Sequence, residues 1–143
     1  MAGDKPGATI LLVDDQETLL AAVAKMLRKK GFSVLAVADG AAAVDQLRLH
    51  GNGIALLILD VTLPGLSSRE VLEQARRMRP GIPVILTSAF CQDVINSFAG
   101  LHIDHFIRKP YRLAALVDLL QSVLATTMVS HQHDVFEARR DSA

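Results

Sequence analysis

Short apolar runs that each end in a polar side chain are the feature that most limits how this chain can fold. In the clearest run, residues 54–59, every position is apolar, and the next residue is Asp60. Similar runs lead into Asp14-Asp15, Ser88 and Lys109. A strand that is apolar on both faces is typical of a parallel sheet covered by helices on both sides, because neither face of such a strand meets water.

Stretches with helical spacing of apolar residues follow each of these runs. The chain therefore predicts an α/β fold with five strands, near residues 9–13, 32–37, 54–60, 84–87 and 105–108. Right-handed crossovers and short loops favour a doubly wound, flavodoxin-like parallel sheet in the order 2-1-3-4-5. We expect the third helix to open at Ser67, three residues before Glu70 in a capping-box pattern, and the fourth helix, around residues 94–100, to be the weakest.

Length and composition predict one domain. The chain has 143 residues, half of them apolar, which is enough for one buried core and too little for two. We expect an N-terminal linker over residues 1–8 and a single domain over residues 9–125. Residues 126–143 lose helical spacing and are expected to form a flexible C-terminal tail.

Charge and cysteine content narrow the expected partners and location. Lysine plus arginine and aspartate plus glutamate balance at 15 each, so net charge gives no reason to expect direct DNA binding or an anionic membrane. No apolar run approaches the length of a membrane span, and the N-terminus lacks the apolar core of a signal peptide. The single cysteine fits a reducing, cytoplasmic setting.

Three carboxylates are expected to meet at one edge of the sheet. The carboxyl ends of the first and third strands flank the topological switch point, which brings Asp14, Asp15 and Asp60 together. Their mutual repulsion calls for a cation, and a ligand set of oxygen atoms suits Mg²⁺ or Mn²⁺ better than zinc. We expect Asp15 and Asp60 to bind the ion directly, Asp14 directly or through water, and the backbone carbonyl of Val61 to assist.

The same edge predicts phosphoryl chemistry. A carboxylate beside a metal ion can attack phosphorus and form an acyl phosphate, which makes Asp60 the candidate nucleophile. Ser88 and Lys109, at the ends of the adjoining strands, would then hold phosphoryl oxygens. The tight turn expected at Lys109-Pro110 favours a cis peptide bond, although the residues alone leave cis and trans open.

These motifs, in this order, resemble the defining motifs of response-regulator receiver domains. The resemblance covers roughly residues 9–124 and rests on Asp14-Asp15, on the segment LDVTLPG at residues 59–65, on Ser88-Ala89 and on Lys109-Pro110. It implies that Asp60 is the phospho-acceptor, that Asp14 and Asp15 bind magnesium, and that Lys109 completes the site. It also implies that Ser88, rather than Thr87, is the switch hydroxyl, because Ser88 precedes Ala89 and lies five positions after Pro83. Phe106 is then the switch aromatic, and Thr62 and Phe90 tune the lifetime of the phosphoryl group.

The resemblance further implies a phosphorylation switch of a two-component system rather than an enzyme that turns over an external substrate. A histidine kinase or phosphotransfer protein would donate the phosphoryl group, and the receiver would catalyse its own phosphorylation and slow dephosphorylation. The signal would pass to a downstream protein or to attached kinase domains, since the motif style is similar to receivers of hybrid sensor histidine kinases. A homodimer is compatible with the sequence.

Two positions depart from the receiver pattern. Phe106 stands where a tyrosine is commoner, and Ser68 stands where many relatives carry glycine.

Two other functions also remain open. A haloacid-dehalogenase-type phosphohydrolase uses a strand-end aspartate too, but it needs a second acid where this chain has Thr62. A receiver-like interaction module that is never phosphorylated is the other alternative.

The arginines of the third helix, Arg76, Arg77 and Arg79, are expected to form its solvated face.

Overall fold

The chain folds around a parallel sheet of five strands. The computed structural model describes residues 7–63, 66–90, 92, 94, 96, 98–103 and 105–132, with side chains up to residue 126. The strands are β1 (Thr9–Val13), β2 (Ser33–Val37), β3 (Ile54–Asp60), β4 (Val84–Ser88) and β5 (His105–Arg108). Their order in the sheet is β2-β1-β3-β4-β5, and all neighbouring strands are parallel, which confirms the predicted fold.

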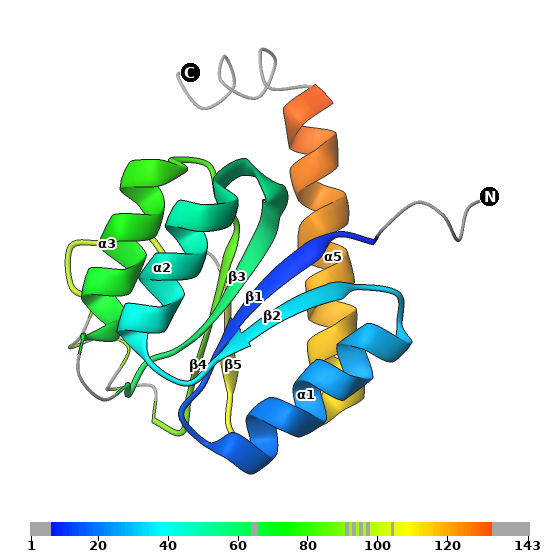
Figure 1. The fold of residues 1–143 in the computed structure, drawn as a ribbon, viewed down its shortest axis with the longest axis horizontal. Coiled ribbons are helices and arrows are strands. Elements are labelled where there is room, and N and C mark those ends of the chain that lie inside the picture. The colour runs from blue at the N-terminus through cyan, green and yellow to red at the C-terminus, as the bar shows by residue number, and fades with distance from the viewer. Residues whose placement is uncertain are drawn as a thin grey trace.

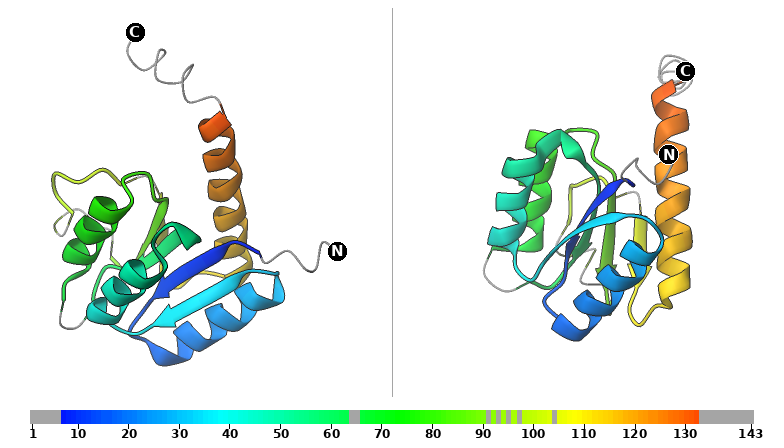
Figure 2. Two further views of the ribbon diagram at one scale, coloured as in Figure 1. Left: turned by 45° about the horizontal axis from the view of Figure 1, so that its top comes forward. Right: turned by 45° about the vertical axis from the view of Figure 1, so that its right-hand side comes forward.

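Helices cover both faces of this sheet (Figures 1 and 2). On one face lie α2 (Gly40–His50) and α3 (Ser68–Met78), and on the other lie α1 (Glu17–Lys29) and α5 (Leu113–Gln132). A short 3-10 helix, η2 (Gly51–Gly53), connects α2 to β3. The molecule therefore has three layers, with the sheet in the middle.

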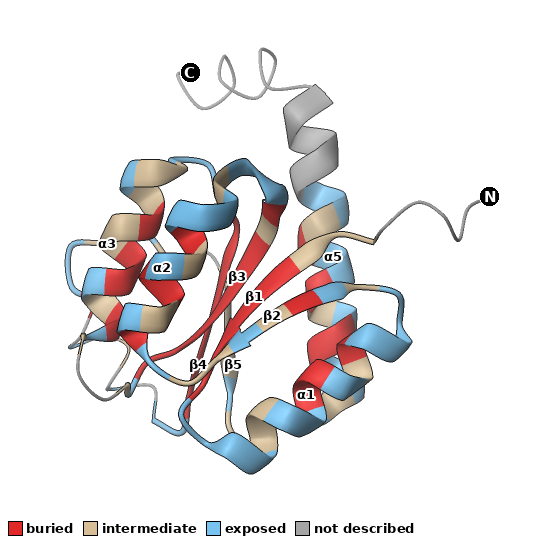
Figure 3. Cartoon of the chain, in the orientation of Figure 1, coloured by how far each residue is buried: buried red, intermediate tan, exposed pale blue. Residues whose placement is uncertain are grey.

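Alternate residues of each central strand enter two separate apolar cores. Along β3, Leu57 and Leu59 pack into the core beneath α2 and α3. Leu56 and Ile58 pack into the core beneath α1 and α5. All four side chains are fully or almost fully buried, as the red strands in Figure 3 show. Burial on both faces explains why the strand sequences contain no polar alternation.

The start of α3 agrees with the predicted capping pattern. Ser67 is the N-cap residue, and its hydroxyl accepts a hydrogen bond from the backbone N–H of Glu70. The same hydroxyl donates to the Glu70 carboxylate over 3.2 Å. These contacts satisfy one of the free N–H groups at the start of the helix and hold the Glu70 side chain beside it.

Helix α5 is longer than the sequence predicts. It continues to Gln132, past the expected end of the domain at residue 125. Figure 2 shows that this last part of the helix extends beyond the sheet. The apolar spacing of the sequence fades after residue 125, although the backbone stays helical to Gln132. The N-terminal linker up to residue 6 and the tail from residue 133 lie outside the described residues.

The region expected to form the fourth helix is described only in part. Gln92, Val94 and Asn96 are helical, and residues 98–100 form a turn. The other residues of that prediction, including Ile95, lie outside the described part of the chain. Within the described residues, no helix is both long and apolar enough to cross a membrane.

The arginines of α3 correct one prediction. Arg77 is exposed as expected, but Arg76 donates a hydrogen bond to the carbonyl oxygen of His102 over 2.5 Å. Arg79 donates to the carbonyl oxygens of Gly51 and Ile54. Arg69, the second residue of α3, likewise donates to the carbonyl oxygen of Ala99. A guanidinium group carries several N–H donors on a long side chain, so it can reach loop carbonyls that have no partner in a strand or helix.

The close approach of α2 to the loop before α3 yields a stability prediction. A Cβ atom added at Gly40 would lie 2.4 Å from the carbonyl oxygen of Leu66 and 3.0 Å from a methyl carbon of Val71. Gly40→Ala should therefore lower the free energy of unfolding by about 1–3 kcal/mol, although alanine normally favours a helix. Urea denaturation measures this change.

Gly81→Ala is the matched control for this substitution. A Cβ atom at Gly81 meets nothing within 4 Å, so the same change there should alter stability by less than about 0.5 kcal/mol. Equal losses of stability in the two variants would contradict the steric explanation.

Candidate functional site

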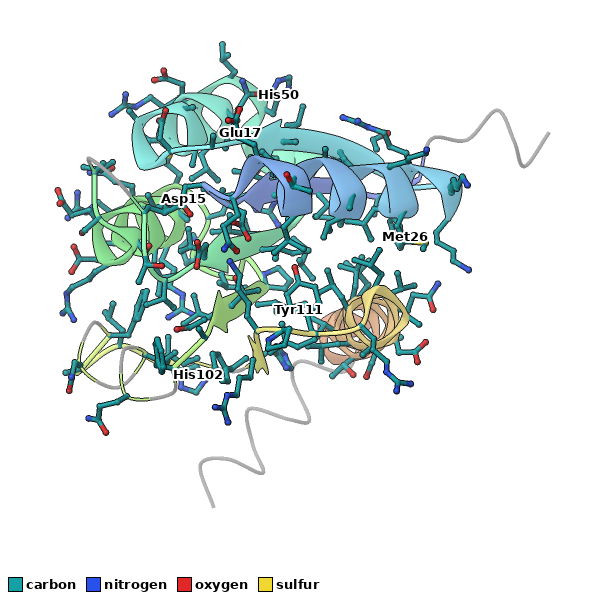
Figure 4. The ribbon with its side chains drawn as sticks, turned by 90° about the horizontal axis from the view of Figure 1, so that it is seen from below. Asp15, Glu17, Met26, His50, His102 and Tyr111 are labelled. Carbon is teal, nitrogen blue, oxygen red and sulfur yellow. The ribbon has the colours of Figure 1, made fainter. Side chains whose placement is uncertain are left out.

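The site lies where β1, β3 and β5 end, and backbone hydrogen bonds continue past each strand end to fix it. The N–H of Asp14 donates to the Val37 carbonyl, and the N–H of Val61 donates to the Thr87 carbonyl. The N–H of Lys109 donates to the carbonyl of Ser88 over 2.8 Å. Figure 4 looks at this end of the molecule, with Asp15 labelled on the loop after β1. These bonds extend the hydrogen-bond ladder of the sheet to Asp14, Val61 and Lys109.

Three carboxylates meet at this edge, as predicted. Asp14 and Asp60 are buried, and Asp15 is exposed. One carboxylate oxygen from each of the three lies within 4.8 Å of the others. Two buried acids and one exposed acid form a cluster that is open to solvent on one side, and its donor atoms are all oxygens.

Lys109 supplies the positive charge opposite these acids. Its Nζ atom lies 2.9 Å from Oδ2 of Asp14 and 3.5 Å from Oδ2 of Asp60. It also donates to the side-chain carbonyl of Gln16 over 2.9 Å. The Lys109-Pro110 peptide bond is cis. Lys109 and the two buried acids thus form one charged network with little exposure to solvent.

Burial and neighbouring charge shift the acid-base behaviour of Asp60. Burial of the carboxyl, helped by the negative charge of Asp14, raises the pKa of Asp60 from 3.8 to about 6. The ammonium of Lys109 and the N–H of Thr62 oppose this rise in pKa. The N–H of Thr62 donates to Oδ1 of Asp60 over 3.4 Å. Within the described residues, Oδ2 of Asp60 is buried and has no hydrogen-bond partner.

Ser88 is buried near the site but bonds within its own turn. Its hydroxyl donates to the carbonyl oxygen of Phe90 over 3.0 Å and accepts from the Phe90 N–H over 3.1 Å. The loop after β4 therefore satisfies this hydroxyl, which forms no hydrogen bond with the three acids among the described residues.

The remaining predicted residues surround the acids at different depths. Val61 is buried beside Asp60, whereas the side chain of Thr62 is exposed. Phe90 is 64% exposed, which is unusual for a large aromatic side chain. Phe106 is half-buried and packs against the core beneath α2 and α3. Pro64 and Gly65, which form the predicted turn after β3, lie outside the described residues.

Sequence reasoning missed the contacts of Gln16 and Ser68. The backbone N–H of Gln16 donates to Oδ1 of Asp14, and the side-chain carbonyl of Gln16 accepts from Lys109. Gln16 therefore orients both Asp14 and Lys109. The buried hydroxyl of Ser68 donates to the backbone carbonyl of Asp60 over 2.5 Å. Glycine at position 68 could not make this bond, so the departure noted from sequence ties the start of α3 to the end of β3.

Tyr111 is a further neighbour of the acids that the motifs did not indicate. Burial raises the pKa of the Tyr111 hydroxyl, and the negative charges of Asp14 and Asp60 raise this pKa further. With Lys109 and four other residues it lines an open cavity of about 260 Å³; the others are Gln16, Leu19, Ala89 and Pro110. Figure 4 shows Tyr111 at this end of the molecule, next to α5.

Comparisons with known proteins agree with this arrangement. Residues 10–121 match the family described as the response regulator receiver domain. The sensory transduction protein RegX3 of Mycobacterium tuberculosis is 36% identical over 118 residues, which are 81% of this chain and 50% of RegX3. The probable transcriptional regulatory protein TcrX of the same organism is 32% identical over 130 residues, or 89% of this chain and 54% of TcrX.

Solved structures share the fold. A response regulator receiver protein from Sinorhizobium medicae has a TM-score of 0.75 and 26% identity, and the match covers 85% of this chain and 97% of that one. NtrX from Brucella abortus has a TM-score of 0.78 at 23% identity, with 91% of this chain and 29% of NtrX covered. The chain thus spans about half the length of the curated relatives it matches.

These relatives correct the expected partners. The sequence predicted no direct DNA binding and looked instead to a downstream protein or attached kinase domains, but TcrX is named as a probable transcriptional regulatory protein. That partner prediction is wrong, because it rested on net charge. The charge of a receiver describes its own surface and carries no information about contacts made elsewhere in a longer regulator. From its motifs, its fold and its relatives together, the chain belongs to the response regulator receiver domains of two-component systems.

Proposed function

We propose that Asp60 accepts a phosphoryl group from a phosphohistidine donor and that the chain relays this event as a conformational change. The observation that carries the proposal is the state of the Asp60 carboxylate. It is buried, its Oδ2 atom has no hydrogen-bond partner among the described residues, and Lys109 lies 3.5 Å from that atom. A carboxylate that is desolvated and only weakly neutralised is a better nucleophile than one in water.

The proposed transfer uses residues already in place. An ionised oxygen of Asp60 forms a bond to phosphorus while the bond between phosphorus and the donor imidazole nitrogen breaks. The electron pair of that bond stays on the imidazole. The ammonium of Lys109 offsets negative charge on the phosphoryl oxygens, and Ser88 would exchange its bond with the Phe90 carbonyl for one with the phosphoryl group.

A divalent cation, magnesium or manganese, fits the acids of this site. Among the described residues, Oδ2 of Asp60 has no hydrogen-bond partner, and one oxygen from each of the three carboxylates lies within 4.8 Å of the others, which gives an all-oxygen donor set of the kind that these ions prefer. Asp14, Asp15 and Asp60 would hold the ion, and the carbonyl of Val61 would assist. When bound, the ion supplies positive charge that offsets the carboxylates and the incoming phosphoryl group.

The rest of the proposal concerns output and lifetime. Ser88 and Phe106 act as the switch pair that couples the phosphoryl group to the surface around β5. Thr62 and Phe90 flank the acids and set how easily water reaches the phosphoryl group. Residues 9–125 form the functional unit, which turns over no external substrate and acts in the cytoplasm, as its single cysteine favours.

Incubation with Mg²⁺ and a small phosphodonor should add the mass of one phosphoryl group, because Asp60 is a pre-placed nucleophile. Intact-mass spectrometry measures the gain, and Asp60→Asn should abolish it. Asp45→Asn is the matched control, since this acid is exposed on α2, and it should leave the gain unchanged. A gain that survives in Asp60→Asn would refute the assignment of the acceptor.

The raised pKa of Asp60 predicts a pH-dependent stability difference. The pKa of Asp60 is about 6 in the folded chain and near 3.8 when unfolded, so folding is penalised once the carboxylate ionises. Without divalent cations, Asp60→Asn should raise the free energy of unfolding at pH 7 by about 1–3 kcal/mol. This advantage should shrink as the pH falls from 6 towards 4, where wild-type Asp60 regains its proton.

Urea denaturation of both proteins in chelator, at several pH values, measures this difference. Asp45→Asn again serves as control and should show little change in stability at any pH. An advantage of Asp60→Asn that stays constant between pH 4 and pH 7 would contradict the proposed burial of charge.

A further inference from the structure

Thr87 holds a buried hydroxyl that the proposed function does not use. Its side chain is 1% exposed, and within the described residues its Oγ1 atom has no hydrogen-bond partner. The only other buried side-chain atom in this condition, within the same part of the chain, is Oδ2 of Asp60. The Thr87 hydroxyl can donate a hydrogen bond and the Asp60 oxygen can accept one, so the two atoms are chemically complementary.

The register of the sheet places these two side chains next to each other. Between β3 and β4, Asp60 pairs with Thr87. One pair earlier, Leu59 and Leu86 both enter the core beneath α2 and α3, and one pair before that, Ile58 and Ile85 both enter the opposite core. Since side chains alternate along a strand, Asp60 and Thr87 lie side by side on the face beneath α1 and α5.

The third strand of this edge brings Lys109 to the same face. Thr87 pairs with Ile107 of β5, and Lys109 follows Ile107 by two positions. The ammonium of Lys109 reaches Oδ2 of Asp60. Thr87 is therefore on the strand between the acid and the lysine. Ser88 points to the other face of the sheet, the one on which Leu86 lies beneath α2 and α3. Its hydroxyl donates to the Phe90 carbonyl.

We propose that the Thr87 hydroxyl is a positioning group for Asp60: a rotation about its Cα–Cβ bond lets it donate a hydrogen bond to the Asp60 carboxylate. Threonine side chains occupy discrete staggered positions, and a change between them moves the hydroxyl without moving the strand. The bond would satisfy two buried polar atoms at once, which a buried site strongly favours.

This inference rests on the proposed function and assigns Thr87 a role in the loss of the phosphoryl group. In that step a water oxygen forms a bond to phosphorus, the bond between phosphorus and the Asp60 oxygen breaks, and its electron pair returns to the carboxylate. The proton of the attacking water passes to solvent. A hydrogen bond to a full carboxylate is stronger than one to an acyl phosphate, so Thr87 speeds this hydrolysis.

The lifetime of the phosphoryl group in three variants tests the role of Thr87. Each protein is phosphorylated with a small phosphodonor and Mg²⁺, freed of donor by desalting, and followed by intact-mass spectrometry. Thr87→Val keeps the shape and removes the hydroxyl, and it should lengthen the half-life on the order of 3–10-fold. Thr87→Ser keeps the hydroxyl and should return the half-life to near the wild-type value. Thr9→Val makes the same chemical change at the start of β1, far from the acids, and should have no effect.

The outcomes separate this inference from the function on which it rests. A Thr87→Val half-life equal to or shorter than that of wild type would overturn the role of Thr87 while leaving Asp60 as acceptor. Equal effects of Thr87→Val and Thr87→Ser would also overturn it, because a purely structural role depends on packing rather than on the hydroxyl. If the wild-type chain takes up no phosphoryl group, the proposed function fails and this inference fails with it.

Discussion

The charge balance between Lys109 and the buried acids is the interaction on which the rest of this structure depends. Two carboxylates with almost no exposure to solvent lie at neighbouring strand ends, and one ammonium contacts both of them. Like charges at such distances repel strongly when water is excluded. Lys109 reduces this repulsion but does not remove it, since the pKa of Asp60 stays well above its ordinary value. The site is thus charged, buried and under-neutralised, and such a site favours the arrival of further positive charge.

The sheet and the central acids could be predicted because they follow from patterns along single strands. Continuous apolar runs report burial on both faces, and the residue after each run lies at the sheet edge whatever its neighbours are. The strand order and the meeting of Asp14, Asp15 and Asp60 therefore needed no knowledge of side-chain contacts. The cap at Ser67 was predictable for the same reason, since it depends on residues only three positions apart.

Most of the contacts that sequence reasoning missed join a side chain to a group far away in the sequence. Arg76 and Arg79 bond to carbonyls that lie more than twenty positions away, and such bonds leave no periodic trace in the sequence. In the sequence Gln16 is an ordinary polar residue, and its contact with Lys109 forms only because the fold places the end of β5 beside it. The length of α5 was missed for another reason, because the apolar spacing that indicates a helix fades in the sequence before the helix ends. The partner prediction failed because composition describes a surface and not a position within a regulatory protein.

The bond from Ser68 to the Asp60 carbonyl makes α3 a rigid link between two distant parts of the molecule. At one end, the helix is fastened to the peptide group of the acid itself. Along its length, Arg69 and Arg76 hold the carbonyls of Ala99 and His102, in the segment that leads into β5. Because these two arginines are seven positions apart, they lie on one side of the helix and form hydrogen bonds with that segment at two points. Helix α3 therefore connects Asp60 to the segment before β5 through these three hydrogen bonds. A receiver with glycine at position 68 would lack the bond to Asp60.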